Sequence, residues 1–190
     1  MTEVNVDLAP WKPIPTPIPP EWVNLTQDLA NRAKGLPHAY VLKTVKYDAR
    51  GVGDLLRSWG LPLSAVMAGY LMEYDKRHIQ ATQLDGIEQV LKHIEAAGRY
   101  ARDIEDENLA PLLNPPYADL NALLIAMATY YQSLKHLQQQ DIVRPLSARI
   151  LIRIERIGNV LLNIAKQLGM WYFKREIEDM TKHLLNPYIF

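Results

Sequence analysis

The sequence contains no cysteine and carries no formal net charge. Without cysteine it can form no disulfide bond, no thiolate zinc site and no thiol nucleophile, a composition that suits a reducing cytosol. Basic and acidic side chains number 21 each, so no overall field attracts nucleic acid or an anionic membrane. We therefore expect a cytoplasmic protein that binds neither nucleic acid nor membrane.

Long apolar runs and common enzyme motifs are also missing. The longest apolar stretch, residues 120–131, is interrupted by Asn121 and is shorter than the ~20 residues that a membrane helix needs. The opening MTEVNVDLAP lacks the basic and then apolar order of a secretory signal. No P-loop, GxGxxG, GxSxG or HExxH pattern occurs, so the best-known phosphate, dinucleotide, serine-hydrolase and zinc-protease signatures give no assignment.

Proline is concentrated near the N-terminus. Six of the 13 prolines fall between Pro10 and Pro20, where their fixed φ and missing N–H groups forbid a helix and favour an extended chain. We interpret residues 1–20 as an extended strap or spacer. The remainder, residues 21–190, is long enough to bury a core and is predicted to form a single domain.

Apolar residues in this remainder recur at helical spacing, and no sustained alternation of period two is found. The predicted fold class is therefore all-α. Helices are expected over residues 21–34, 49–59, 63–79, 85–107, 118–140, 145–168 and 170–185. Glycine, asparagine and proline stand at the expected helix ends, at Gly35 and at residues 60–62, 114–116 and 186–187.

The segment 145–168 has the clearest helical pattern. Its apolar residues step by three and four along one face, and we expect this stripe to be buried: Ile150, Ile154, Ile157, Leu161, Ile164 and Leu168. Arg149, Arg153 and Arg156 form a second stripe on another face. We favour a solvated surface for these arginines, and a surface for an anion or an acidic partner stays open as the alternative.

One candidate metal site can be drawn from spacing alone. Glu176, Asp179 and His183 share a helical face and could hold a cation. Arg175 and Lys182 stand between them, so an ion-paired surface is the preferred interpretation.

Several segments of the chain resemble one known family. Residues 164–171 (IAKQLGMW) and 185–187 (LNP) are similar to the end of the hydrolase domain of the bacterial Rel/SpoT alarmone enzymes. Upstream, residues 32–37 (RAKGLP) resemble a loop that this family uses around the nucleotide. Residues 61–72 (LPLSAVMAGYLM) resemble the family's helix that ends in a His-Asp doublet. The similarity covers about residues 25–190.

The resemblance implies a compact all-α HD domain. In that family two histidines and two aspartates hold manganese, and a Glu-Asp pair assists the attack of water on the 3′-diphosphate of (p)ppGpp. The resemblance places the four metal-ligand positions at Asp48, Met72, Glu73 and Thr129, and the Glu-Asp pair at Lys76 and Arg77. A thioether and a hydroxyl are poor ligands for this cation, so we expect no cofactor. Replacing two carboxylates with cations changes a corner that holds cations into one that prefers anions.

The resemblance further implies that a phosphorylated ligand is held by Arg32, Lys34, Lys76 and Arg77. The leading hypothesis is a regulatory pseudoenzyme of the Rel/SpoT type, which has lost hydrolysis and binds a partner. That partner is a guanine nucleotide, another phosphorylated small molecule, or a protein, including a second copy of this chain.

Two alternatives stay open. In the first, Asp48, Glu73 and Asp75 rebuild an oxygen-only site, and the chain is a manganese-dependent phosphohydrolase acting on a nucleotide such as (p)ppGpp. In the second, the domain is an all-α structural adaptor.

Overall fold

The computed structural model describes residues 14–32, 48–106, 108, 112, 119–139 and 146–186. Every regular element in this part of the chain is an α-helix, which confirms the predicted fold class. The helices are α1 (Pro20–Arg32), α2 (Ala49–Ser58), α3 (Leu63–Leu71), α4 (Lys76–Gln80), α5 (Ile87–Glu105), α7 (Leu120–Gln139), α8 (Ala148–Gln167) and α9 (Trp171–Leu185). None of these described helices is both long enough and apolar enough to cross a membrane.

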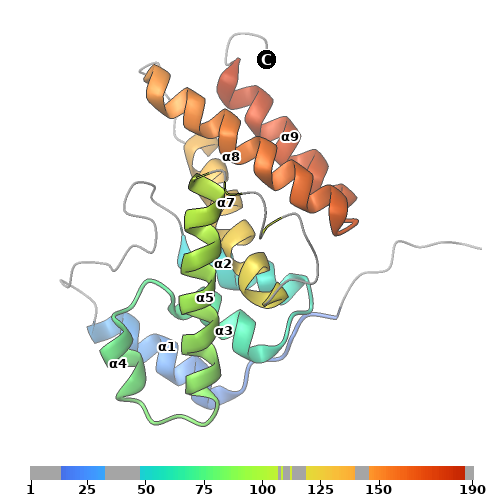
Figure 1. Ribbon diagram of the computed structural model, residues 1–190. Coiled ribbons are helices and arrows are strands. Elements are labelled where there is room, and N and C mark those ends of the chain that lie inside the picture. The colour runs from blue at the N-terminus through green and yellow to red at the C-terminus, as the bar shows by residue number, and fades with distance from the viewer. Residues whose placement is uncertain are drawn as a thin grey trace, which may run out of the picture.

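Two long helices, α5 and α7, pack against each other at the centre of the bundle (Figure 1). Helix α2 packs on α3 and α7, and α3 also contacts α5. Helices α8 and α9 lie side by side at one end of the molecule, whereas α1 and α4 lie toward the other end (Figure 1). Helices α2, α3 and α7, in or beside which Asp48, Met72 and Thr129 lie, therefore contact one another, whereas α1 and α4 pack on α3 and α5.

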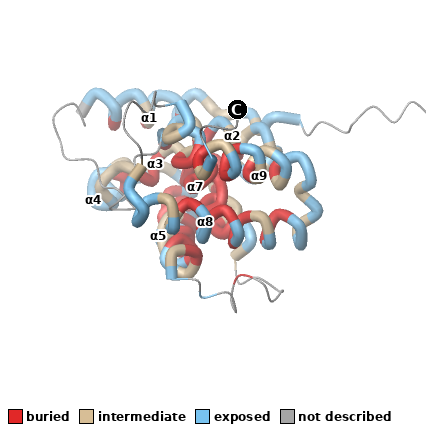
Figure 2. The backbone as a smooth tube through the Cα atoms, turned by 90° about the horizontal axis from the view of Figure 1, so that it is seen from above, coloured by how far each residue is buried: buried red, intermediate tan, exposed pale blue. Residues whose placement is uncertain are grey.

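The buried residues form one hydrophobic cluster that draws on α1 to α5 and α7 to α9. Figure 2 shows this buried material where α3, α5, α7 and α8 come together. Ile154, Ile157, Leu161 and Ile164 of α8 are buried, as the stripe predicts. The prediction was wrong for Ile150, which is 40% exposed because the first turns of α8 border a surface groove instead of the core.

Helix ends follow the local chemistry of the chain. The side chain of Asp48 accepts a hydrogen bond from the N–H of Arg50 at 3.1 Å and so caps α2. Helices α2 and α9 end where expected, with Gly60 at a φ of 71° and Asn186 as the C-cap. Gly35 and residues 114–116 lie outside the described residues.

The single helix expected over residues 63–79 is two helices, α3 and α4. Asp75 adopts an extended backbone and its carboxylate accepts the N–H of Arg77 at 2.8 Å. A short acidic side chain that bonds to the following backbone competes with helix continuation and favours a new helix start. The apolar spacing continues across the break, which is why periodicity alone missed it.

The described part of the Pro-rich segment, residues 14–19, forms no helix. The Thr16 hydroxyl donates to the Leu61 carbonyl at 2.6 Å, and the Arg57 side chain donates to the Thr16 carbonyl at 2.8 Å. These bonds hold the segment against the end of α2, which agrees with its interpretation as a strap.

Helices α8 and α9 approach closely where Gly158 faces Thr181. A Cβ atom placed on Gly158 would lie only 2.7 Å from Oγ1 of Thr181. The turn between the two helices contains Gly169 at a φ of 69°, a conformation that glycine adopts without strain. Both features fix how α8 sits on α9.

Candidate functional site

The positions that the resemblance assigns to metal ligands come from three helices that contact one another. Met72 follows the last residue of α3 and Thr129 lies in α7, and both are buried. The Thr129 hydroxyl donates to the Ile125 carbonyl at 2.8 Å and lies 3.5 Å from Sδ of Met72. We call this region, where α2, α3 and α7 meet, the α2–α3–α7 junction.

Asp48 belongs to the exposed edge of the same junction. A Cβ atom on Gly51 would lie 3.1 Å from Oδ2 of Asp48 and 3.0 Å from Oε1 of Gln132, so both oxygens lie close to one point. The Gln132 amide also donates to the Gly51 carbonyl at 3.0 Å. Because Gln132 is one turn from Thr129 on α7, the structure brings Asp48 toward Thr129 and Met72.

The side chains at the junction do not fit a manganese ion. The four assigned positions offer a buried thioether, a buried hydroxyl, the exposed carboxylate of Asp48 and the half-buried carboxylate of Glu73, whereas this cation prefers a full set of carboxylate, imidazole or water ligands. Within the described ranges, no three or more His, Asp or Glu residues form a group that could hold a metal. Neither Asp48, Glu73 and Asp75 nor Glu176, Asp179 and His183 form such a group.

The two cations assigned to the anion-preferring corner each have a carboxylate beside them. The Arg77 guanidinium bonds to both oxygens of Asp75, at 3.2 and 3.1 Å, and holds the pKa of that carboxyl at about 2. Nζ of Lys76 lies 3.8 Å from Oε2 of Glu95. Arg32 ends α1 and its side chain is not described, and Lys34 lies outside the described residues. The described part of this set is therefore a pair of exposed, ion-paired side chains.

A polar cluster around the buried His93, which sequence reasoning missed, joins α3, α5 and the start of α7. Nδ1 of His93 lies 2.9 Å from Oδ2 of Asp119, and Nε2 lies 3.3 Å from both the Ser64 hydroxyl and the Gln89 amide. The imidazole therefore donates to Asp119 and accepts from one of the other two side chains. The Asp119 carboxylate also caps α7 by accepting the N–H of Ala122 at 3.0 Å.

The contacts run from a serine through a histidine to an aspartate, as they do in serine hydrolases. The Gln89 amide contacts Nε2 at the same distance as Ser64, so the two side chains compete for this nitrogen. The cluster also ties α3, α5 and the start of α7 together. The sequence could have indicated Asp119 as a helix cap, because this residue stands at the expected start of a helix. Its contact with His93 could not be read from spacing.

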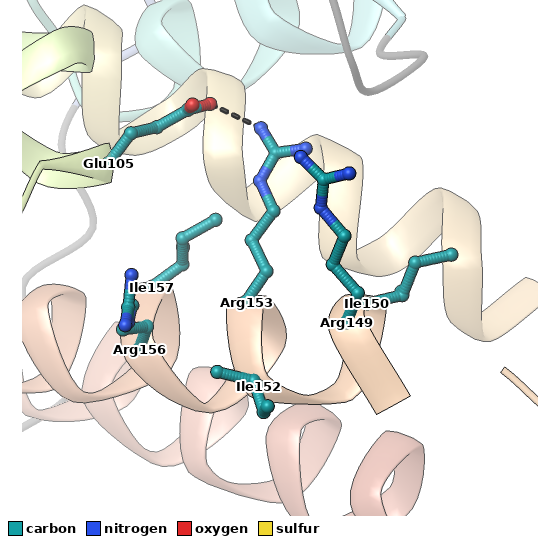
Figure 3. Close-up of a pocket in the computed structure, with 7 residues that line it drawn as sticks. All are labelled: Glu105, Arg149, Ile150, Ile152, Arg153, Arg156 and Ile157. Atoms are coloured by element: carbon teal, nitrogen blue, oxygen red, sulfur yellow. Dashed lines mark hydrogen bonds and ion pairs between the residues drawn. The ribbon is translucent and has the colours of Figure 1, made fainter. Parts of the chain in front are cut away.

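A charged groove lies along the first half of α8, beside the end of α5. It has a volume of about 740 Å³ and is lined by three arginines and one glutamate: Arg149, Arg153, Arg156 and Glu105. Figure 3 shows the guanidinium groups of Arg149 and Arg153 side by side, with Arg153 ion-paired to Glu105. The arginine stripe found in the sequence therefore borders a concave surface.

The Glu105 side chain is held in place by a residue of the core. The buried Tyr130 hydroxyl lies 3.0 Å from Oε1 of Glu105 and 2.8 Å from the Ala101 carbonyl, to which it also donates. Burial, and then the charge of Glu105, raise the pKa of Tyr130 far above its ordinary value, so the phenol stays protonated and acts as a donor. A chain of contacts thus runs from Tyr130 through Glu105 to Arg153.

Comparison with models of protein families, with curated proteins and with solved structures found no match to this chain.

Proposed function

We propose that this chain is a domain of the Rel/SpoT hydrolase type that has lost hydrolysis and acts by binding, as a regulatory pseudoenzyme. One observation carries the proposal. Where the resemblance implies a histidine and an aspartate, Met72 and Thr129 contact each other in the core. These two side chains fill the space with a thioether and a methyl group, which supports packing, and neither of them carries a charge to hold a cation.

The charges near the junction also support a loss of hydrolysis. A manganese-dependent hydrolase needs carboxylates to orient the metal and the attacking water. Here the positions assigned to the Glu-Asp pair carry cations, and Asp75 is bonded to Arg77. No observation favours the alternative site of Asp48, Glu73 and Asp75.

The structure gives more support to a protein partner than to a nucleotide. Lys76 and Arg77, proposed to hold phosphate, already have carboxylate neighbours that a nucleotide would have to displace. The groove on α8, by contrast, has more guanidinium groups than carboxylates among its lining residues. A cationic surface with exposed apolar side chains suits a macromolecular partner.

The loss of hydrolysis is tested with the purified full chain. We expect no stoichiometric manganese in the protein, no rise of the melting temperature with MnCl₂, and no release of pyrophosphate from ppGpp, because the ligand set is too poor. Turnover that depends on manganese would overturn the proposal.

A reverse variant provides the positive control. It restores the ligand types that the resemblance implies: Asp48→His, Met72→His, Glu73→Asp and Thr129→Asp. Manganese should raise its melting temperature while leaving wild type unchanged, because a metal that binds only the folded state stabilises that state. The same variant with Thr129→Val as the fourth change is the matched control. Failure of the reverse variant to respond would remove the support for an HD-type frame.

The nucleotide branch has its own test. If Lys76 and Arg77 hold phosphate, the double variant Lys76→Ala/Arg77→Ala should weaken ppGpp binding at least tenfold in calorimetry, as expected for two lost charged contacts. An unchanged affinity would exclude Lys76 and Arg77 as the residues that hold phosphate.

A further inference from the structure

We propose that the groove between α8 and the end of α5 binds an acidic, amphipathic segment of a partner protein. This inference deepens the binding function proposed above, because it names a site and a class of partner. It rests on the charge balance of the groove, on the pattern of apolar and basic residues along α8, and on the fixed position of one arginine.

The groove carries an excess of positive charge. Among the described residues that line it, Glu105 is the one carboxylate, and it is ion-paired with Arg153. Arg149 lies one turn before Arg153 on α8, so two like charges are neighbours on the helix surface with one compensating group. A carboxylate from a partner placed between them would relieve this repulsion and receive hydrogen bonds from planar donors suited to it.

Apolar side chains alternate with these cations. Ile152 is 54% exposed and lies three residues after Arg149 and four residues before Arg156, so the three share one face of α8. Ile150, 40% exposed, lines the groove as well. The complementary partner presents a carboxylate three or four positions from an apolar side chain, which is the pattern of an amphipathic acidic helix.

A nucleic acid or a free nucleotide suits the groove less well. No aromatic ring is among the described residues that line it, so a base has no stacking surface. Isoleucine side chains, in contrast, gain from contact with the apolar side chains of a peptide.

Arg153 is already positioned for recognition. Its side chain is bonded to Glu105, and Glu105 is bonded to the buried Tyr130 hydroxyl. An arginine that is ordered before binding loses less conformational entropy when a partner arrives. The groove therefore combines a fixed donor, Arg153, with a more exposed one, Arg149.

The test is a selection from a library of random peptides, each long enough for about four helical turns. The full chain is the bait, and peptides that also bind the Arg149→Gln variant are removed. We expect the enriched peptides to carry Asp or Glu next to apolar residues at spacings of three or four. No enrichment, or enrichment of basic or uncharged peptides, would overturn the proposal.

The affinity of an enriched peptide is then measured by fluorescence anisotropy. Arg149→Gln should weaken binding about tenfold, as the loss of one charged hydrogen bond does, and Ile152→Ser about fivefold. Arg175→Gln, an exposed arginine of α9 outside the groove lining, removes the same charge and should change affinity less than twofold. Equal losses in both arginine variants would mean non-specific attraction and would overturn the proposal.

Competition with ppGpp and with a single-stranded oligonucleotide completes the test. If either displaces the peptide at a lower concentration than the unlabelled peptide does, the groove is a phosphate site and the proposal is wrong. The metal and hydrolysis assays do not involve this groove, so failure here and failure of the pseudoenzyme proposal are separate outcomes.

Discussion

At the α2–α3–α7 junction the side chains that meet in the core are a thioether and a hydroxyl, whereas the groove on α8 is lined by three guanidinium groups and a carboxylate. The junction is closed by packing, and Met72 and Thr129 are almost fully buried. The groove presents its charges at the surface, and its Glu105 contacts Tyr130 of α7. This difference teaches that two adjacent residues of α7 serve different surroundings: Thr129 contacts Met72 in the core, whereas Tyr130 supports the groove through Glu105.

The largest effect is expected from charging the junction. Thr129→Asp should lower the free energy of unfolding by about 4 kcal/mol, because it places a carboxylate in the core without a cation. Urea denaturation at neutral pH measures this loss. The loss should shrink in acid, since burial raises the pKa of the new carboxyl and its neutral form is tolerated better.

Thr129→Val is the matched control and should cost about 1 kcal/mol, the value of a lost hydrogen bond. If MnCl₂ stabilised Thr129→Asp but not Thr129→Val, the junction would still hold a cation and the contrast between the two regions would disappear.

An intermediate effect is expected from Tyr130, which lies in the core and supports the groove. Tyr130→Phe should reduce the free energy of unfolding by about 1.5 kcal/mol, because the hydroxyl contacts both the Ala101 carbonyl and Glu105. It should also weaken binding of an enriched peptide about threefold, since Glu105 no longer holds Arg153 in one position. A stability loss without any change in affinity would show that the core and the groove are independent.

The smallest effect is expected when the ion pair of Arg77 with Asp75 is removed. Arg77 has this carboxylate partner beside it and so contrasts with Arg149. The pKa of Asp75 is lowered from 3.8 to about 2, first by its side-chain hydrogen bond with Arg77. A carboxyl whose pKa is lower in the folded state than in the unfolded chain stabilises the fold at pH values above its unfolded pKa. This stabilisation is lost as the pH falls through the pKa of the folded state. Asp75→Asn should therefore reduce how far the free energy of unfolding falls between about pH 5 and about pH 2, as measured by urea denaturation at each pH.

Arg77→Gln should flatten the same acid slope, and the double variant should add little, because both changes remove one interaction. Additive effects would show that other groups set the pKa of Asp75.

Much of the fold could be predicted because helical periodicity and caps are local. The isoleucine stripe of α8 identified a buried face correctly from Ile154 to Ile164. The break between α3 and α4 was missed because the Asp75 cap interrupts a pattern that remains apolar on both sides. Ile150 was misplaced because periodicity shows which face is apolar, but not where the core ends along the helix.

The candidate site was less predictable, since it depends on contacts between distant residues. The contact of Met72 with Thr129 spans 57 positions, a separation that no local pattern of the sequence can bridge. The neighbours of Lys76 and His93, in contrast, are Glu95 and Asp119, which no spacing rule connects to them. For the arginine stripe, the sequence left two interpretations open, and the concave surface beside the end of α5 could not be read from the stripe alone.

The contact between Gly158 and Thr181 has a consequence for the speed of association. With no room for even a methyl group, the close approach at Gly158 restricts rotation of α8 against α9, so the backbone that carries the arginines is held in one place on the molecule. A partner then meets the same surface at every collision and need not wait for a rare conformer. Its rate of capture is set by diffusion and by long-range attraction between opposite charges, and that rate should fall as added salt shortens the reach of those charges.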